Sequence, residues 1–295
     1  TLAFEGAGAV ILACRFSLDF GILEGVKLGI FHSISAFCNA GFDLLGRNQA
    51  FVSMSGYVDD PVVNLTLIAL IVIGGLGFFV WSDVYEKKKF QRFGLHTKLT
   101  LTMTAALLLG GWVLTMWFEW TNPGTLGGLS TPGKVLASAF QSATLRTAGF
   151  SGIDQGALTG PSQGLAVVMM LIGGSPGSTA GGLKTVTVAV LLLTAWTAVC
   201  GRSEVIAFER RISSRAIMNA VTMLVVGVVL VFASSVPMSH IEGLPLVPCV
   251  YETASAFGTA GLSMGITPQL SAFSRCLLIA LMYLGRVGVL PLGVG

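Results

Sequence analysis

The stretch FQSATLRTAGF, Phe140 to Phe150, organises the interpretation of the whole chain, because related copies of it stand on either side. With the Ala-Gly pairs aligned, the copies are FHSISAFCNAGF, which ends at Phe42, and YETASAFGTAGL, which ends at Leu262. The glycines of successive copies are 108 and then 112 residues apart. A repeat of this regularity indicates one structural unit that is used at least three times.

Each copy lies between two apolar runs of membrane length. A short helix that enters the apolar layer and turns back at a glycine leaves backbone groups that must face protein or a water-filled cavity. Glycine permits positive φ angles and a close backbone approach, and carbonyl oxygens presented in this way replace the water around a cation. The unit is therefore predicted to be a pore-loop unit, and ion conduction is the leading functional hypothesis.

The backbone of the three Ala-Gly turns is the predicted ion-binding site. One such turn alone could be an ordinary helix ending, but three copies in register between membrane spans favour pore loops. The Ala-Gly turns comprise Cys38, Asn39, Ala40 and Gly41; Arg146, Thr147, Ala148 and Gly149; and Gly258, Thr259, Ala260 and Gly261.

Composition places the chain in a bilayer. Of 295 residues, 53% are hydrophobic and 11% are charged, against about 25% charged in soluble domains. The net charge of +3 is small and dispersed, which argues against nucleic acid as a partner. Five scattered cysteines provide neither a disulfide framework nor metal-ligand spacing. Thr1 is not an initiator and no signal peptide is recognisable, so the chain is expected to be part of a longer protein.

The predicted elements follow from the apolar runs and their breakers. They are a helix tail over 1–16, a pore helix over Leu28–Phe37, a turn-rich segment over Asp43–Asp60, spans over Val62–Trp81 and Thr100–Trp117, a pore helix that begins at Pro132, two half-helices within Gly164–Val199, a span over Ile217–Val236, a pore helix after Pro245 and Pro248, and a last span from Ser271 to about Leu292. The predicted units are 1–98, with its first helix truncated, 99–215 and 216–295.

The run between 164 and 199 is too long for one span and is interrupted by a stretch that we call the 173–182 loop. Five glycines and a proline in ten residues do not hold a continuous helix, so an irregular loop at membrane depth is predicted. It comprises Gly173, Gly174, Ser175, Pro176, Gly177, Ser178, Thr179, Ala180, Gly181 and Gly182. The following Leu183-Lys184-Thr185 resembles the end of a phosphate-binding loop, but Leu183 separates glycine from lysine and no strand precedes the loop.

Charge placement predicts the orientation. The two segments that join units, 82–99 and 200–216, hold five and four Lys or Arg residues, whereas Arg47 and Lys134 stand in segments assigned to the opposite side. Cytoplasmic loops are enriched in these residues. The joining segments are therefore expected in the cytoplasm, and the Ala-Gly turns are expected to open to the outside.

Several side chains have two interpretations. Arg286, within the last span, is either an arginine that ties helices together or a cation barrier below the turns. Arg146 is expected to brace its turn from behind, and Lys184 to flank a half-helix. Acidic residues on the outer side, Glu119, Asp154 and Glu252, could concentrate cations at the mouth or be ordinary solvated charges. His32 is expected to be a packed pore-helix residue.

Glycines also recur after each turn. Ile73-Gly74-Gly75, Ile172-Gly173-Gly174 and Leu284-Gly285-Arg286 follow the turn glycine by 33, 24 and 24 residues. Close helix packing through small residues is the simple explanation. It accounts for Gly74-Gly75-Leu76-Gly77, but not for the 173–182 loop.

In these motifs the chain resembles the membrane subunit of the bacterial Ktr/Trk potassium uptake systems, a superfamily that includes the plant HKT transporters. The resemblance rests on FCNAGFD, RTAGFSGID, GGSPGSTAGGLKT, SAFGTAGLSMG and LGRVG, in that order, and fits the Ktr branch best. It implies an all-α integral membrane fold of helix–pore loop–helix units around a pseudo-fourfold pore. Three of the four units are present, and the first would precede Thr1.

The resemblance also assigns roles to residues. It implies that Gly41, Gly149 and Gly261 are selectivity-filter glycines, with Asn39, Thr147 and Thr259 beside K⁺ sites. The 173–182 loop would be the gate, with Arg286 as its pore-facing companion. It further implies a homodimer in the cell membrane on a cytosolic, nucleotide-binding regulatory ring of the RCK type, with Na⁺ as a coupling ion in some members.

The predicted function is K⁺ uptake by gated passive conduction through a filter of backbone carbonyls, without enzymatic chemistry or a cofactor. A relative that conducts Na⁺, or transports Na⁺ and K⁺ together, is the alternative within the superfamily; some such relatives have serine in place of one filter glycine. A membrane-embedded nucleotide-dependent enzyme that uses Lys184 is the alternative of another class. It would need a catalytic base or metal cluster, and the sequence offers no such constellation.

Overall fold

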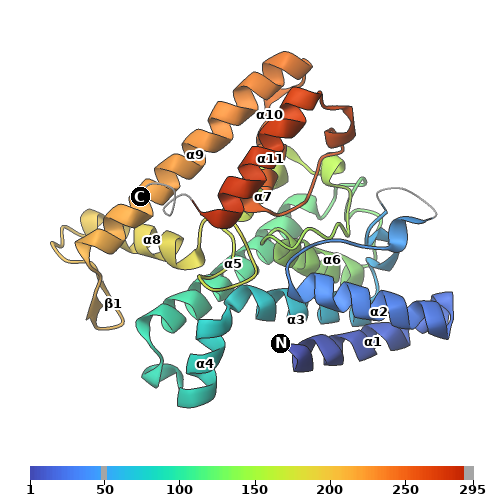
Figure 1. Ribbon diagram of the computed structural model, residues 1–295, viewed down its shortest axis with the longest axis horizontal. Helices are drawn as coiled ribbons and strands as arrows, with labels where there is room; N and C mark the ends of the chain where they lie inside the picture. The colour runs from blue at the N-terminus through green and yellow to red at the C-terminus, as the bar shows by residue number, and fades with distance from the viewer. Residues whose placement is uncertain (48–51, 289–295) are drawn as a thin grey trace.

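The computed structural model describes residues 1–47 and 52–288 of the chain, and its regular structure is almost entirely helical (Figure 1). The elements are α1 (Leu2–Phe20), α2 (Ile22–Phe37), η1 (Leu45–Arg47), η2 (Ser55–Tyr57), α3 (Pro61–Leu76), α4 (Phe78–Lys87), η3 (Phe90–Arg92), α5 (Leu95–Glu119), α6 (Thr131–Thr144), η4 (Gln155–Ala157), α7 (Gly160–Leu171), α8 (Thr185–Val199), β1 (Ile206–Ala207), β2 (Arg210–Arg211), α9 (Ser214–Glu242), α10 (Leu246–Gly258), η5 (Thr267–Gln269) and α11 (Ala272–Val287). Apart from the short antiparallel hairpin β1–β2, the predicted all-α fold is confirmed.

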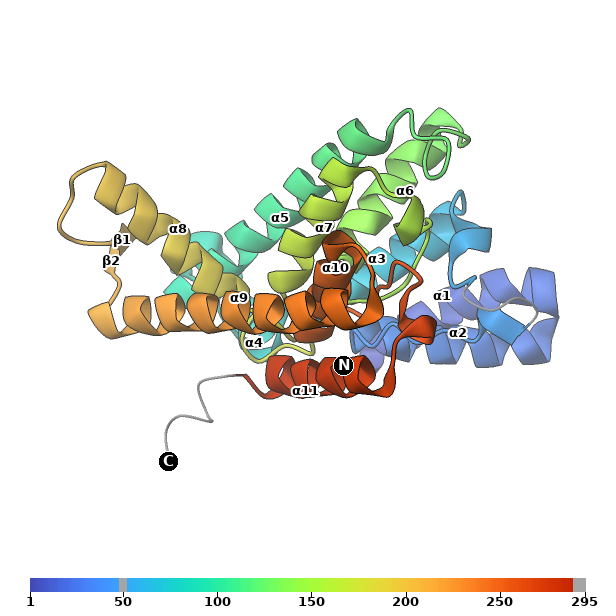
Figure 2. The same ribbon diagram turned by 90° about the horizontal axis from the view of Figure 1, so that it is seen from above.

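The same three-helix arrangement occurs three times. An outer helix, a short pore helix and an inner helix follow one another as α1–α2–α3, α5–α6–α7 and α9–α10–α11, and an Ala-Gly turn comes directly after each pore helix. In Figures 1 and 2 the blue, green and orange-to-red groups occupy different sides of the molecule, and the loops after the pore helices run between them.

Local sequence explains where these helices begin. The Asp60 carboxylate accepts hydrogen bonds from the backbone N–H groups of Val62 and Val63, and Pro61 occupies the first turn of α3. The Ser130 hydroxyl caps α6 in the same way. Such residues satisfy N–H groups that have no partner within the helix, so α3 and α6 start where their caps stand.

The first unit differs from the prediction at its beginning. The pore helix α2 starts at Ile22 rather than Leu28, directly after Gly21, whose φ of +80° turns the chain back along α1. The helix α1 also continues through Arg15 and Asp19 to Phe20. Arg15 pairs with Asp19 and with Asp60, the capping residue before α3, and this compensation lets two charges remain in one helix.

The predicted span over Val62–Trp81 is not continuous. The helix α3 ends at Leu76, and the chain bends by 91° at Gly77 before α4 begins. Gly77 has φ +82°, and the equivalent Gly288 after α11 has φ +85°. Only glycine adopts this conformation readily, so the same residue type ends both inner helices.

The long outer helices extend beyond their predicted ends. In the described part of the chain α5 and α9 are each long and apolar enough to cross a membrane, and the bent pair α3–α4 meets that criterion if counted as one span. The last helix ends at Val287; the predicted continuation of this span to Leu292 lies outside the described residues.

The hydrophobic core crosses the unit boundaries. Phe140 and Phe150 of the second unit pack in the cluster built on Leu12, Phe16 and other residues of the first unit. Another cluster joins Leu145 and Met170 of the second unit to Tyr251 and Leu262 of the third. The turns are therefore positioned by packing between units as well as within them.

Candidate functional site

The three Ala-Gly turns share one backbone conformation. The residue two positions before each glycine has a positive φ: 49° at Asn39, 63° at Thr147 and 53° at Thr259. The glycines have φ values of 71° (Gly41), 90° (Gly149) and 84° (Gly261). Left-handed backbone is uncommon outside glycine, so its recurrence at equivalent non-glycine positions marks a specialised structure rather than chance helix endings.

The three turns come together in space. A β-carbon on Gly149 would lie 2.5 Å from the carbonyl oxygen of Ala260 and 3.2 Å from the Cα of Gly41. One on Gly41 would lie 2.7 Å from the Cα of Gly149, and one on Gly261 would lie 3.7 Å from that same atom. The glycines, more than 100 residues apart in the chain, thus converge so closely that any side chain at Gly41 or Gly149 would collide with a neighbouring turn.

A single large cavity opens onto all three glycines; we call it the vestibule. Its volume is about 1070 Å³. The lining residues are Gly41, Asp43, Val52, Ser53, Ser55, Gly149, Ser151, Ile153, Asp154, Gln155, Gly261, Leu262, Ser263, Met264, Gly265, Thr267, Pro268 and Arg275. Residues from every unit contribute, mostly from the segments that directly follow the turns.

Each of the first two turns is held by its own pore helix. The Ala40 N–H donates to Ser35 O at 2.9 Å, and the Ala148 N–H donates to Thr144 O at 3.0 Å. The hydroxyl groups of the same two residues donate to the carbonyl oxygens that follow the glycines, Ser35 to Phe42 O at 2.8 Å and Thr144 to Phe150 O at 2.6 Å. These bonds fix both ends of the turn on the pore helix.

The third turn uses a carboxylate instead. The Ala260 N–H still donates to Ser255 O at 2.8 Å, but the segment beyond the glycine is bound by Glu252 of α10. The buried Glu252 carboxylate accepts hydrogen bonds from the Met264 N–H and from the hydroxyls of Ser263 and Thr267. Glu252 therefore anchors the wall of the vestibule; it is not the solvated mouth charge considered in the sequence analysis.

The second turn contains the most deeply buried polar groups. Arg146 is buried, and its guanidinium Nη2 lies 3.5 Å from the hydroxyl of Thr104 on α5, an outer helix. The arginine thus reaches behind its turn. The Thr147 side chain is fully buried, and its hydroxyl has no hydrogen-bond partner in the described residues.

The 173–182 loop interrupts the predicted long span, and the two half-helices α7 and α8 flank it. A parallel bridge between Ile172 and Leu183 closes its base, with hydrogen bonds from Gly173 N to Leu183 O and from Leu183 N to Leu171 O. The two ends of the loop are therefore held side by side, and the residues between them form a closed loop.

Other units hold the body of the loop. The Ser175 N–H donates to Gly75 O at 3.0 Å, and the Ser175 hydroxyl donates to Leu76 O. The Phe78 N–H donates to Gly177 O at 3.3 Å. These bonds satisfy backbone groups that the break at Gly77 releases, which explains the bend in the first unit. On the other side, the Gly182 N–H donates to Gly285 O of α11 at 3.3 Å.

The loop also touches all three turns. The Thr179 hydroxyl donates to the Asn39 side-chain oxygen at 2.9 Å. A β-carbon on Gly173 would lie 3.4 Å from the Thr147 methyl group, and one on Gly181 would overlap the Thr259 side chain. The contacts are made by the residue two positions before each turn glycine, whereas the glycines line the vestibule. The turns therefore separate the loop from the vestibule.

Two cations lie at the loop. Arg286 donates from Nη1 to Thr179 O, and Lys184 donates from Nζ to Ala180 O at 2.7 Å. Arg286 was expected within a span, but it lies in the last turn of α11, because the helix ends before Gly288. Lys184 is the residue before the first turn of α8, as its predicted flanking role requires.

The recurring glycines after the turns serve close packing. A β-carbon on Gly74 would overlap the carbonyl oxygen of Phe37, and one on Gly285 would overlap that of Phe257. Both carbonyls stand four residues before a turn glycine. Small residues on the inner helices therefore let them approach the ends of the pore helices, as the sequence analysis proposed for the first pair.

Two glutamates, the buried Glu119 and the partly exposed Glu242, form a repeated clamp that the sequence analysis did not predict. Glu119, at the end of α5, accepts hydrogen bonds from the N–H and hydroxyl of Thr159, at 2.9 and 2.6 Å. Glu242, at the end of α9, accepts equivalent bonds from Ser271. Each carboxylate thus caps the inner helix of its own unit. The available signal was the N-cap residue of each inner helix, Thr159 before α7 and Ser271 before α11, because Thr and Ser are preferred at that position.

The prediction for Glu119 was therefore wrong: its side chain is fully buried and lines no part of the vestibule. Asp154 and Asp43 do line it, together with Arg275, a cation that the charge argument overlooked. His32 is fully buried with Nδ1 2.7 Å from Leu28 O, as expected for a packed pore-helix residue.

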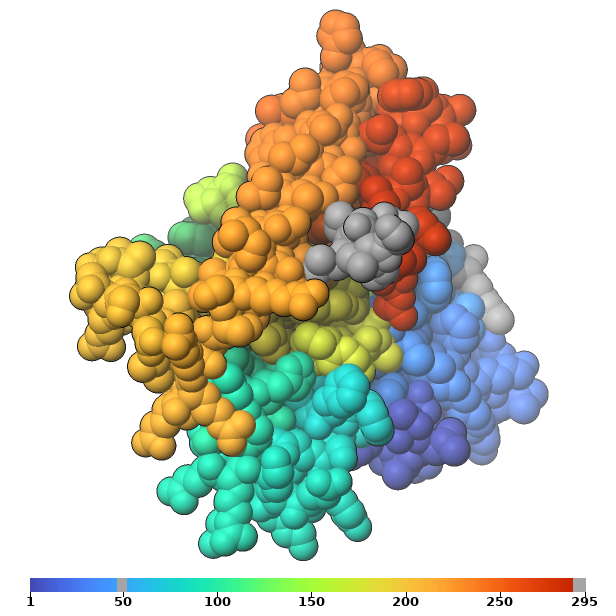
Figure 3. All heavy atoms as spheres, turned by 60° about the vertical axis from the view of Figure 1, so that its left-hand side comes forward, coloured from blue at the N-terminus to red at the C-terminus, as the bar shows by residue number. Residues whose placement is uncertain are grey.

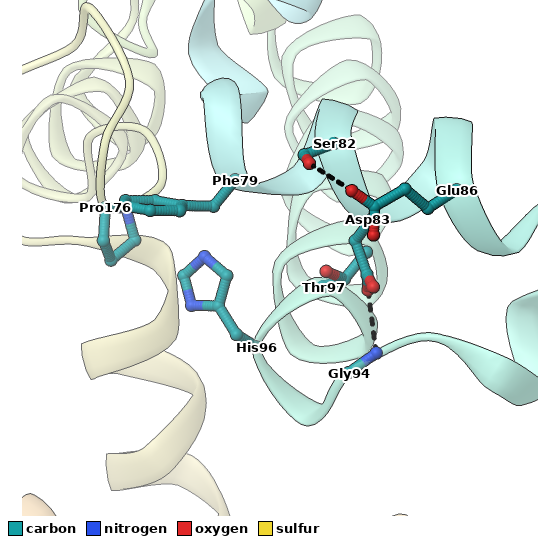
Figure 4. Close-up of a pocket in the computed structure, with 8 residues that line it drawn as sticks. All are labelled: Phe79, Ser82, Asp83, Glu86, Gly94, His96, Thr97 and Pro176. Atoms are coloured by element: carbon teal, nitrogen blue, oxygen red, sulfur yellow. Dashed lines mark hydrogen bonds between the residues drawn. The ribbon is translucent and has the colours of Figure 1, made fainter.

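A second cavity of about 500 Å³ meets the loop at Pro176 (Figure 4). It is lined by Phe79, Ser82, Asp83, Glu86, Gly94, His96, Thr97 and Pro176. In Figure 4 the Phe79 ring lies beside Pro176 and the His96 ring lies below both. The loop is thus accessible at a surface formed by α4 and the start of α5, and no residue of the three turns lines this cavity.

Comparison with known proteins gives family matches over nearly the whole chain. The model of the TrkH family, described as cation transport protein, matches residues 7–294. Ktr system potassium uptake protein B of Bacillus subtilis is 38% identical over 290 residues, which cover 98% of this chain and 64% of that protein. The protein of the same name from Vibrio alginolyticus is 38% identical, with 99% and 63% covered.

A further relative carries a broader name. Potassium/sodium uptake protein NtpJ of Enterococcus hirae is 38% identical, covering 96% of this chain and 62% of that protein. The chain thus spans less than two thirds of the length of these relatives. Among solved structures, the potassium transporter TrkH from Vibrio parahaemolyticus matches with a TM-score of 0.71 and 19% identity, over 95% of this chain and 60% of that one. At this sequence identity, the likeness shows a shared fold and nothing beyond it.

Proposed function

Because the chain belongs to the TrkH family of cation transport proteins, an integral membrane family, we propose that it forms three quarters of a pore that carries K⁺ into the cell. The observation that carries the proposal is the convergence of Gly41, Gly149 and Gly261 at the base of one vestibule. Backbone carbonyls at such a site can replace the hydration shell of a monovalent cation.

The proposed filter is formed by the three Ala-Gly turns. The K⁺ sites lie beside Asn39 with Gly41, Thr147 with Gly149, and Thr259 with Gly261. The repeated positive φ angles support this assignment, as does the buried Thr147 hydroxyl, which has no partner in the described residues. Hydrogen bonds from each turn to its pore helix keep the spacing of the carbonyls fixed, which selectivity by coordination requires.

The proposed gate is the 173–182 loop. It lies against the side of the turns away from the vestibule, so an ion that passes the filter meets it next. Arg286, bonded to the loop at Thr179, adds a positive charge there, and a cation at membrane depth repels K⁺ strongly. We propose that conduction requires the loop and Arg286 to move aside, and that transport is passive, driven by the electrochemical gradient.

The decisive experiment uses the complete gene in a host that lacks its own K⁺ uptake. We expect growth at low external K⁺ and saturable K⁺ uptake. Deletion of Ser175–Ser178 should raise the unregulated flux, because the loop would no longer block the pore. No rescue by a protein that reaches the membrane would refute K⁺ uptake, whereas rescue with unchanged flux in the deletion would refute only the gate.

Na⁺ transport is the second candidate, since the similarly related NtpJ is named for potassium and sodium uptake. Flux of both ions through the reconstituted protein separates the two cases. Each of the three turns in this chain has glycine at the proposed filter position, which favours K⁺. Saturable Na⁺ flux that equals or exceeds the K⁺ flux would favour the alternative.

The proposed assembly is a homodimer in the cell membrane that associates with a cytosolic nucleotide-binding ring. The names of the relatives describe components of a Ktr system, which supports further components in general, whereas the homodimer and the ring rest on the family resemblance. The basic segments 82–99 and 200–216 are proposed to face the cytoplasm. Labelling of cysteines placed at Lys88 and at Asp154 in intact cells tests this orientation, because only the second should react with an impermeant reagent.

A further inference from the structure

An apolar groove lies apart from the vestibule, between α5, α8 and the hairpin β1–β2. Its volume is about 380 Å³, within the roughly 300–1,000 Å³ that small-molecule sites occupy. The lining residues are Leu99, Thr102, Met103, Ala106, Ala189, Leu192, Leu193, Ile206, Ala207 and Phe208. Every one except Thr102 is apolar, so the groove offers almost nothing to a polar ligand.

The groove has a packed floor and open walls. Leu99, Ala189 and Ala207 are buried in one hydrophobic cluster. By contrast, Leu192 and Ile206 are each 57% exposed. The floor is therefore fixed by the fold, while the walls present apolar surface to whatever surrounds the helices at this level, which in a membrane is hydrocarbon.

Basic side chains stand at the hairpin end of the groove. The Lys98 ammonium lies 5.6 Å from the centre of the Phe208 ring and 5.9 Å from that of Phe90. It donates to Gln91 O at 3.0 Å, which uses one of its three N–H donors. Arg210 and Arg211 pair across the hairpin with Ala207 and Ile206, two residues that line the groove.

Figure 3 shows this end of the molecule, with the hairpin segment (yellow to orange) against the segment around residues 88–98 (cyan to teal). The contact of the Phe90 and Phe208 rings, whose centroids are 6.0 Å apart, joins the two basic segments. Glu204 pairs with Arg211 at 2.9 Å, which leaves Lys98 and Arg210 as the cations at the groove without a carboxylate within ion-pair distance in the described residues.

We propose that this groove binds one acyl chain of an anionic glycerophospholipid, with the phosphate held by Lys98 and Arg210. An apolar channel that ends in cations matches the two parts of such a lipid. Basic pockets between membrane helices bind anionic headgroups, and one lysine or arginine near an anionic lipid surface strengthens binding about fivefold. The lipid site is separate from the proposed filter and the proposed gate. It depends on the proposed function in one respect: the proposed orientation places its headgroup in the cytoplasmic leaflet.

The test is native mass spectrometry of the full-length protein in detergent, titrated with phosphatidylglycerol or with phosphatidylcholine of the same chains. The charge variant is Lys98→Gln with Arg210→Gln, which removes the two proposed phosphate ligands. Lys88→Gln with Lys89→Gln is its control, because those lysines carry the same charge in the segment that contains Lys98, whereas it is the Lys98 ammonium that lies against the Phe208 ring of the groove. Ala106→Trp fills the groove, and Ala106→Leu does so with a smaller side chain.

We expect wild type and the lysine control to bind phosphatidylglycerol more tightly than phosphatidylcholine, and the charge variant to lose roughly 30-fold in its affinity for phosphatidylglycerol. The filled groove should lower binding of both lipids. Equal losses in the two charge variants would overturn the proposal in favour of general electrostatic attraction. Unchanged lipid binding with a shifted monomer–dimer ratio at Ala106 would identify a subunit interface instead. Lipid binding is measured without transport, so neither result depends on K⁺ conduction.

Discussion

The Ala-Gly turns and the 173–182 loop are both irregular backbone inside a helical bundle, yet they are held in opposite ways. Each turn is bound to the pore helix directly before it, through bonds such as Ala40 N–H to Ser35 O. The loop is closed at its base, but its body is held by α3, α11 and the first turn, through residues such as Gly75, Gly285 and Asn39.

This difference has a mechanical consequence. Local bonds repeat with the sequence and persist whenever the pore helix is folded, so the turns keep their shape as a filter must. The bonds of the loop body join different units, so the proposed gate movement would break them without unfolding any helix. The proposed filter and the proposed gate are in contact through Thr179 and Asn39.

The largest effect is expected for Gly149→Ala, a substitution in the second Ala-Gly turn. The methyl group would lie 2.5 Å from Ala260 O in a residue with φ of 90°, and strain of this kind amounts to about 1–3 kcal/mol. We expect the ratio of K⁺ to Na⁺ flux in proteoliposomes to fall by about tenfold or more. Gly164→Ala, in α7 with open space around it, is the matched control and should leave the ratio unchanged. A wild-type ratio in the Gly149 variant would remove this turn from the filter.

A smaller effect is expected at the link between the two regions. Thr179→Val removes the hydroxyl that donates to Asn39 while keeping the shape of the side chain. A net hydrogen bond of about 1 kcal/mol corresponds to a rise of roughly fivefold in unregulated K⁺ flux, with unchanged selectivity. Thr222→Val, at an exposed hydroxyl that bonds only within α9, should have no effect. Reduced flux at Thr179 would indicate that the bond supports the open state.

The glutamate clamps at Glu119 and Glu242 extend the comparison to groups that line no part of the vestibule. Glu119→Gln weakens charge-assisted hydrogen bonds to Thr159 and its neighbours, each worth about 1.5–3 kcal/mol. We expect a lower thermal unfolding temperature and unchanged ion selectivity. Glu86→Gln, on the exposed side of α4, is the control. A selectivity change without loss of stability would return Glu119 to the mouth of the pore.

The smallest effect is expected for the charges of the vestibule. Asp154→Asn should raise the K⁺ concentration for half-maximal uptake about twofold at low ionic strength, because one attractive charge is lost. The effect should disappear near 0.15 M salt, where screening acts within about 8 Å. Asp59→Asn, which lines no part of the vestibule, is the control, and a salt-independent effect at Asp154 would indicate a structural role.

Much of the fold was predictable because it repeats. Three copies of one motif between apolar runs predicted the all-α units, the pore helices and the irregular loop between α7 and α8, and local caps such as Ser130 set several helix starts. The bend at Gly77 was missed, since its cause is the loop of the next unit, whose Gly177 carbonyl accepts from Phe78. A hydropathy pattern contains no information on such a partner.

Acidic residues were predicted less well for a related reason. Glu119 and Glu252 were interpreted either as charges that concentrate cations at the mouth or as ordinary solvated charges of loops. Both are buried. Glu119 accepts hydrogen bonds from Asn122 and Thr125 nearby in the sequence and from Thr159, 40 residues further on, and the Glu252 partners are 11 to 15 residues away. The distant partners are brought into place only by the tertiary fold.

The amino-acid sequence by itself determined the repeated unit, the glycine turn after each pore helix and the presence of an irregular break in one long apolar run, because these depend on neighbouring residues and on glycine. Only the tertiary structure decided that three distant glycines meet at one vestibule, which units hold the loop, and where Arg286 is bonded. Those features depend on contacts between units, and the energy of such contacts is set by packing in three dimensions rather than by the order of residues along the chain.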